Sequence, residues 1–314
     1  MKIFSFDPAD YADTYAERGW IHIRDGIDPE FLAYLKEFTA RRFEEQHVEG
    51  KAIYGAKEQA LFEFPAETDF PGELFDSVAA VAGLNRETMT LSERHIKAYD
   101  ADAPDDPVPH KDRFASQVSV GLSIDIPAGS KLFLYPETDV SVNPYNVSPQ
   151  FLASLEPHQR PEVTLKGAPC VEIEDRPGDV GMFRGSAMWH GRRHGANATN
   201  LYLKMNDFNS DPLGEDPSTE ERRRRTQELA ASANGSLPSL RPVLARRLDV
   251  FARQLSRDGQ EVLQAHLWEE QPVVLSQAEW DLLHSIDGRR SVADLGADTA
   301  TVQRLAQRGV IELD

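Results

Sequence analysis

Apolar residues recur at helical spacing near the start of the chain. Phe31, Leu35 and Phe38 follow one another by three or four residues, and Asp28 stands where a residue that caps a helix is expected. Residues 7–46 therefore predict a short helix, a strand and a long helix. We interpret the apolar stripe of the long helix as core packing.

From residue 91 to residue 208 the pattern changes to short stretches in which apolar and polar residues alternate, separated by Gly, Pro and Asp. Side chains alternate between the two faces of a strand, so this pattern predicts strands. The predicted strands are Val118–Ile126, Lys131–Leu134, Val171–Glu174, Val180–Phe183 and Leu201–Met205. Many short strands joined by turns favour a mainly β fold with flanking helices, built on a double-stranded β-helix (jelly roll). The insert 140–169 is predicted to form a lid or a cleft wall.

The composition changes again after residue 208. We expect a jelly-roll domain at 1–210, a linker with a mixed-charge helix at 211–239, and a small α+β domain at 240–314. In the last of these, the pattern predicts a helix at Leu240–Leu255 and paired strands at Glu261–Val274. The further elements expected are a helix behind a capping box at Ser276 and Glu279, a helix at Thr299–Gln307 and a strand at Val310–Leu313. This order suggests a winged helix.

Charge and cysteine content narrow the function classes. The 314 residues carry 52 acids and 34 bases, a net charge of −18, which disfavours a nucleic-acid binder. We find no apolar stretch that would span a membrane and no signal peptide, so we expect no membrane partner. The single cysteine, Cys170, fits a reducing compartment, and we expect a cytoplasmic protein.

One short motif carries candidate metal chemistry. In His110-Lys111-Asp112, the imidazole and the carboxylate are two residues apart, and on a strand both would point to the same side. A second imidazole, from Trp189-His190 about eighty residues later, would complete two nitrogens and one oxygen on one face of a metal ion. That set, with open positions opposite, is typical of non-haem Fe(II) oxygenases, whereas zinc more often takes a closed set or a third histidine.

Three blocks of sequence carry a resemblance to a known family. They are Glu17–Glu30, the segment from Val108 to Pro136 around His110-Lys111-Asp112, and Pro177–Phe183 running into Trp189-His190. In this order and spacing they resemble the Fe(II)/2-oxoglutarate-dependent oxygenases, closest to the phytanoyl-CoA dioxygenase-like branch. The resemblance covers roughly residues 10–208.

The resemblance implies an enzyme that uses Fe(II), 2-oxoglutarate and O2 to abstract a hydrogen from its substrate. His110, Asp112 and His190 would be the catalytic metal ligands. His194, four residues beyond His190, is the alternative distal ligand, but it looks like a loop residue. Related halogenases replace the carboxylate by a small residue, so Asp112 favours hydroxylation, or desaturation, over chlorination.

The distal carboxylate of 2-oxoglutarate needs a cation. The family usually supplies an arginine ten to fifteen residues after the distal histidine, and this chain lacks one there. The first cation on the following predicted strand is Lys204, our first choice, with Lys131 and Lys97 as alternatives. Arg192 and Arg193 look too near His190 to reach the far end of the cosubstrate.

The substrate is less well defined by the sequence. Arg94 lies on the strand before the metal motif, Arg113 follows the motif directly, and Arg184 precedes His190. If two of them face inward, they favour a small carboxylate-bearing substrate, such as an amino acid in specialised metabolism.

The C-terminal unit opens further possibilities. Residues Leu283–Leu295 resemble the PqqD-like peptide-recognition domains, which implies a peptide or protein hydroxylase recruited through this unit. The unit could equally pack on the rest of the chain or form a homodimer. From other classes, a non-catalytic jelly-roll and winged-helix regulator, or a cupin-like metal enzyme without a 2-oxo acid, such as an isomerase, stays open.

Overall fold

The computed structural model describes residues 1–49, 57–138, 141–232, 236–268 and 270–314. The chain forms two compact units, Met1–Phe208 and Asn209–Asp314. None of the helices in these described ranges is long and apolar enough to cross a membrane.

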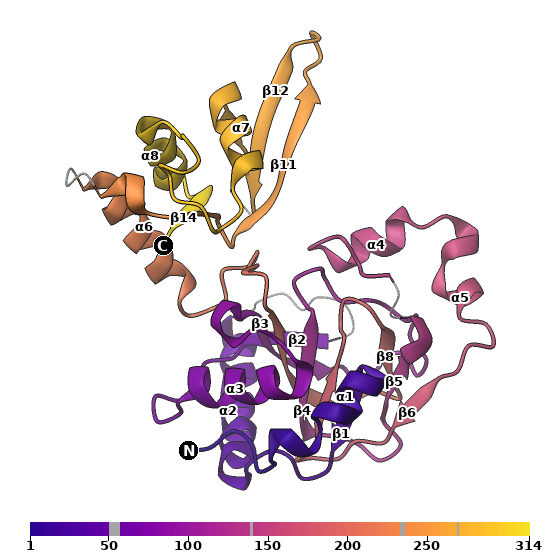
Figure 1. Ribbon diagram of the computed structural model, residues 1–314. Coiled ribbons are helices and arrows are strands. Elements are labelled where there is room, and N and C mark those ends of the chain that lie inside the picture. The colour runs from indigo at the N-terminus through magenta and orange to yellow at the C-terminus, as the bar shows by residue number, and fades with distance from the viewer. Residues whose placement is uncertain (50–56, 139–140, 233–235, 269) are drawn as a thin grey trace. The chain divides into compact units, whose positions relative to one another are not determined.

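The first unit is built on two antiparallel sheets (Figure 1). The larger sheet has the strand order β1-β7-β4-β9-β3-β2 and the smaller one β6-β5-β8. The strands are β1 (Trp20–Ile23), β2 (Lys57–Leu61), β3 (Thr90–Tyr99), β4 (Val118–Asp125), β5 (Lys131–Tyr135), β6 (Val171–Ile173), β7 (Val180–Phe183), β8 (Trp189–Arg193) and β9 (Thr199–Asn206). This mostly β architecture is consistent with the predicted jelly roll, and the five predicted strands are all present.

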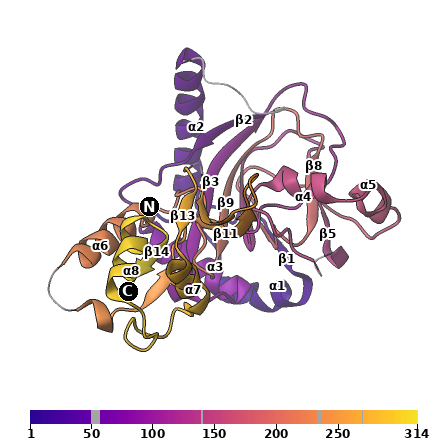
Figure 2. The same cartoon turned by 90° about the horizontal axis from the view of Figure 1, so that it is seen from above.

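Helices flank the two sheets. They are α1 (Ala12–Arg18), α2 (Pro29–Glu49), α3 (Phe70–Ala82), α4 (Ser148–Ser154) and α5 (Pro161–Thr164). The first three cover the large sheet, whereas α4 and α5 lie beside the small one (Figure 2). Phe31 and Leu35 on α2 are fully buried, which confirms the predicted stripe. The insert that carries α4 and α5 was predicted to begin at Val140, which lies outside the described residues.

The strands of the large sheet have one apolar and one polar face, and both faces are buried. On β4, Val118, Val120 and Leu122 join the core beneath the helices. The intervening Ser119 and Ser123 face the other way, into the interior between the two sheets, and both are at most 3% exposed. Alternation therefore places a polar lining inside the unit, and this lining holds the candidate site.

The second unit contains α6 (Thr219–Ala231), β10 (Pro242–Leu244), β11 (Leu248–Leu255), β12 (Glu261–Leu267), β13 (Val273–Leu275), α7 (Gln277–Ser285), α8 (Thr299–Gln307) and β14 (Ile311–Leu313). The predicted helix at Leu240–Leu255 is wrong, because β11 pairs with β12 as an antiparallel hairpin. The capping box is confirmed: the Ser276 and Glu279 side chains each accept a backbone N–H of the other residue. The winged-helix assignment stays a prediction.

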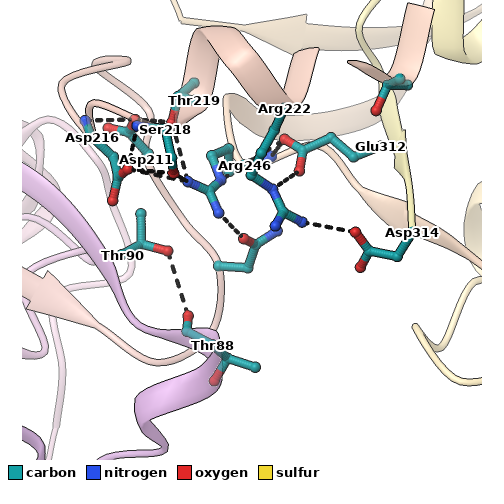
Figure 3. Close-up of polar contacts among 12 residues, drawn as sticks. Thr88, Thr90, Asp211, Asp216, Ser218, Thr219, Arg222, Arg246, Glu312 and Asp314 are labelled. Carbon is teal, nitrogen blue, oxygen red and sulfur yellow. Dashed lines mark hydrogen bonds and ion pairs between the residues drawn. The ribbon is translucent and has the colours of Figure 1, made fainter. Parts of the chain in front are cut away.

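Two arginines, Arg222 and Arg246, connect separate segments of the second unit through hydrogen bonds (Figure 3). The buried Arg246 guanidinium donates to Asn209 Oδ1 at 2.8 Å and to Ser218 Oγ at 3.0 Å. Arg222 on α6 donates to the Glu312 carboxylate on β14 at 3.0 Å and to the Asp314 carboxylate at 3.1 Å. The mixed-charge helix that was expected in a linker is thus attached to the last strand of the unit.

Candidate metal centre

The backbone brings the two halves of the metal motif together. His110 and His190 form an isolated antiparallel bridge, in which each backbone N–H donates to the carbonyl of the other residue at 2.9 Å. The Asp112 N–H donates to the Gly185 carbonyl, also at 2.9 Å. Residues that are eighty positions apart in sequence therefore lie in adjacent extended segments, as the predicted site requires.

The side chains converge on one point. The candidate ligand atoms of His110, Asp112 and His190 all lie within 4.8 Å of one another. His110 Nε2 is 3.9 Å from Asp112 Oδ1, and His190 Nε2 is 3.6 Å from Asp112 Oδ2. Asp112 and His190 are buried, whereas the His110 side chain is 39% exposed, so the group opens to one side.

Both histidines present a ring nitrogen to the site. His190 Nδ1 lies 2.9 Å from the Met188 carbonyl, which can only accept a hydrogen bond. Nδ1 must therefore carry a proton, which leaves Nε2, 3.6 Å from Asp112 Oδ2, as the nitrogen that can bind a metal. Desolvation at the site and repulsion from His190 hold the pKa of His110 well below its usual range, which keeps that ring neutral.

Both oxygens of Asp112 are engaged by the large sheet. Ser119 Oγ on β4 donates to Oδ2 at 2.7 Å, and Lys204 Nζ on β9 donates to Oδ1 at 2.5 Å. Burial raises the pKa of Asp112, but the charges of Lys204 and His190 outweigh it and hold the pKa well below its usual range. Asp112 is therefore a carboxylate near neutral pH.

A second carboxylate organises the cations beside the centre. Glu93 on β3 is 1% exposed and receives Lys97 at 2.9 Å, Arg113 at 3.2 Å and Lys204 at 3.5 Å. Burial raises the pKa of Glu93, but Lys204 and Lys97 outweigh this effect and lower it well below its usual range. Lys97 and Lys204, predicted to bind the cosubstrate, and Arg113, predicted to bind the substrate, therefore all pair with Glu93. The sequence analysis did not identify Glu93 as a site residue.

Lys57 on β2 also faces this pocket, and sequence reasoning missed it. Its ammonium lies 5.3 Å from the centre of the Tyr99 ring and makes no ion pair with a described residue. Burial and the nearby Lys204 lower the pKa of Lys57. The pocket is lined by Lys57, Lys97, Tyr99, His110, Asp112, Leu132, Phe183, His190, Gly191, Tyr202 and Lys204.

Several candidates are not brought to the centre. Lys131 alternates with the inward-facing Leu132 and instead pairs with Glu172 at 3.0 Å. Arg94 lies on the helix-covered face of β3 and donates to the Glu63 carboxylate at 2.8 Å. The Arg184 side chain lies against Gly19, and His194 is exposed and pairs with Asp105 at 3.2 Å.

Arg192 faces the interior, deeper than His190 on the same side of β8. Its two terminal nitrogens donate to the Asp175 carboxylate at 2.9 and 2.7 Å, and Ser123 donates to the same carboxylate at 2.6 Å. Arg192 Nε and Asn200 Oδ1 make no hydrogen bond to a described residue, and both residues line a cavity with room for about one water molecule. The charge of Arg192 is therefore already paired.

The first described residues of the insert contact the metal motif. Lys111, only 1% exposed, donates to the carbonyls of Thr138 and Ser141, and its ammonium lies 5.4 Å from the Trp189 ring centre. The buried Asn143 donates to the Asp112 carbonyl at 2.9 Å. The start of the insert is therefore part of the wall of the site rather than a detached lid.

Comparisons with known proteins give limited similarity. No family model and no curated protein matches the chain. Among solved structures, the chain is similar to the alpha-ketoglutarate-dependent epimerase SnoN from nogalamycin biosynthesis, at 17% identity over 64% of this chain and 84% of that one, with a TM-score of 0.44. It is also similar to the carbocyclase SnoK, at 16% identity over 63% of this chain and 83% of that one, with a TM-score of 0.46. For EctD from S. alaskensis the identity is 12% over 66% of this chain and 81% of that one, with a TM-score of 0.44. Because these identities and TM-scores are low, the functional assignment depends on the geometry of the site.

Proposed function

We propose that this chain is an Fe(II)- and 2-oxoglutarate-dependent oxygenase that oxidises an aliphatic carbon of a small molecule, most simply by hydroxylation. One observation carries the proposal: two imidazoles and one ionised carboxylate, from segments eighty residues apart, converge within 4.8 Å and open to one side. Two nitrogens and one oxygen with free positions opposite suit non-haem Fe(II) better than closed tetrahedral zinc.

The donor set fits the proposed metal. His110, Asp112 and His190 would hold Fe(II), which, with 2-oxoglutarate and O2 bound, supplies the oxidising chemistry. The protein's own residues prepare this set: the Met188 carbonyl fixes the His190 tautomer, and Ser119 fixes the orientation of Asp112. The presence of Asp112 leaves no small-residue position at which a halide could replace the carboxylate, so chlorination is not part of the proposal.

The positive charge of the pocket also suits an anionic cosubstrate. Lys57 makes no ion pair with a described residue, and Lys97 lies beside it in the pocket lining. We therefore assign the distal carboxylate of 2-oxoglutarate to Lys57, with Lys97 as its neighbour. Lys131 faces away, and Lys204 lies at the metal ligand itself, so neither is the preferred anchor.

The charge of the pocket suggests the kind of substrate. In the lining, Lys57, Lys97 and Lys204 stand against a single carboxylate among the described residues, Asp112. Glu93, outside the lining, pairs with Lys97, Lys204 and Arg113. A bound metal would increase this positive excess, and one dianionic cosubstrate would not remove it. We infer a substrate that carries a carboxylate. Of the three candidate arginines, Arg113 is the one that pairs with Glu93 beside the pocket, whereas Arg94 and Arg184 lie elsewhere.

Succinate formation tests the proposal. Purified protein supplied with Fe(II), 2-oxoglutarate and O2 should release succinate, slowly without substrate and faster with the correct small acid. The reaction should stop when iron is chelated and in a His190→Ala variant that still folds. A folded wild-type protein that binds iron but never forms succinate would favour the cupin-like enzyme without a 2-oxo acid.

A further inference from the structure

Lys204 stands in an unusual place for a lysine, directly on a candidate metal ligand. Its side chain is 6% exposed, and Nζ lies 2.5 Å from Asp112 Oδ1. The other oxygen, Oδ2, accepts the Ser119 hydroxyl at 2.7 Å. A cation bound by Asp112 must therefore share a carboxylate oxygen with the lysine or displace it.

The structure offers the lysine a second partner. Glu93 Oε1 is 3.5 Å from Lys204 Nζ, and Glu93 is not among the residues that line the pocket with His110 and His190. Glu93 is already oriented by Lys97 and Arg113, so it does not need to move to receive the ammonium. A short shift of one flexible side chain would exchange the Asp112 contact for a closer Glu93 contact.

We propose that Lys204 is a positioning residue that couples metal binding to anion binding at this centre. The ammonium competes with the metal for Asp112 and repels it, so metal alone binds weakly. A dianionic cosubstrate beside the metal draws the ammonium away from Asp112 and so removes this competition, and metal and cosubstrate therefore bind tightly together. The inference rests on the proposed function and adds a form of regulation to it: the protein retains its metal chiefly when the 2-oxo acid is present.

The physical basis is electrostatic. Two cations in a buried site repel one another more strongly than in water, because the surroundings screen them poorly. Binding free energies are reciprocal, so a group that links the two ligands must strengthen the effect of each on the other by the same factor. Removing the ammonium should therefore change two measurable quantities in opposite directions. The affinity for metal in the absence of cosubstrate should rise. The coupling factor, by which the cosubstrate increases the metal affinity, should fall.

The test measures metal binding rather than turnover. Mn(II), a redox-stable probe, is titrated calorimetrically into the full chain with and without 2-oxoglutarate. The proteins are wild type, Lys204→Met, Lys204→Gln and the exposed-lysine control Lys166→Met. In Lys204→Met we expect Mn(II) alone to bind at least tenfold more tightly, about 1.4 kcal/mol. The improvement in Mn(II) affinity caused by 2-oxoglutarate should shrink at least fivefold, and the control should match wild type.

Lys204→Gln guards against a folding defect, because its amide can still donate to Asp112 but carries no charge. It should shift both quantities in the same direction as Lys204→Met, and thermal unfolding should show that it is folded. Unchanged affinity and coupling in both variants would overturn the inference. Weaker Mn(II) binding in Lys204→Met, which cannot donate to Asp112, would also overturn it, because Lys204 would then simply orient Asp112. If wild type binds no Mn(II) or Fe(II), the proposed function fails first.

Discussion

Gly185 should be essential for the candidate metal centre although it contributes no ligand. A Cβ atom at this position would lie 2.0 Å from Ser119 Oγ and 2.7 Å from Asp112 Oδ2. Cβ atoms are essentially never found within 3.0 Å of another heavy atom of this kind. In a Gly185→Ala variant the serine must rotate away from Asp112, and the carboxylate must move as well.

The size of the effect follows from the contacts that are lost. The Ser119–Asp112 hydrogen bond ends on a charged group, and such bonds contribute about 1.5–3 kcal/mol. Loss of a group that orients a metal ligand typically costs about 10–100-fold in metal affinity. We therefore expect Gly185→Ala to weaken Mn(II) binding by roughly 30-fold, measured by calorimetry, while the far-UV circular dichroism spectrum stays unchanged.

Gly181, four residues earlier on β7, is the matched control. A Cβ atom there would meet only Leu132 Cδ2 at 3.7 Å, an ordinary van der Waals distance. Gly181→Ala should therefore bind Mn(II) as wild type does. Equal affinities for the two alanine variants would refute the view that Ser119 and Gly185 set the geometry of Asp112.

Three further predictions concern the pocket and its walls. Lys57→Met should raise the KM for 2-oxoglutarate by about tenfold, because a charge-assisted bond of ~1.5–3 kcal/mol is lost; an unchanged KM in the succinate assay would remove Lys57 as the anchor. Asp175→Asn should lower the free energy of unfolding by about 3 kcal/mol, since it breaks the buried pair with Arg192. Burial raises the pKa of Asp175, but the Arg192 hydrogen bonds outweigh this effect and lower it. The stability difference should therefore be complete above an unfolded carboxyl pKa of about 3.9 and shrink as the pH falls through the lower folded pKa; a thermal-unfolding difference that does not shrink with acidification below about pH 3.9 would contradict this. Lys111→Met should destabilise the protein by about 2 kcal/mol and speed amide exchange near Ser141, because two backbone carbonyls lose their buried donor; wild-type exchange rates would argue against this.

The sequence was sufficient for the framework of the first unit. Alternation along Val180–Phe183 and its neighbours reflects strands with two distinct faces, and the structure has these strands. The motif around His110 and the distant His190 could be paired because each lies in an extended segment, and the two segments form one antiparallel bridge.

Other features depend on partners that the local pattern does not contain. Leu248, Phe251 and Leu255 have spacings that fit a helix, and only pairing with Glu261–Leu267 makes their segment a hairpin. Lys57 follows residues with no regular pattern, and it reaches the pocket because β2 pairs with β3. The sequence placed Lys131 on the correct strand. Side chains alternate between the two faces of a strand, so Lys131 points outward because its neighbour Leu132 faces inward.

The convergence of three ligands on one metal is the central claim, and metal stoichiometry in single variants tests it most directly. Wild type and His194→Ala should each bind one Fe(II) per chain under anaerobic conditions, because His194 lies at the surface beside Asp105. His110→Ala and His190→Ala should lose this binding while remaining folded. Full Fe(II) binding by a folded His190→Ala protein would contradict the account.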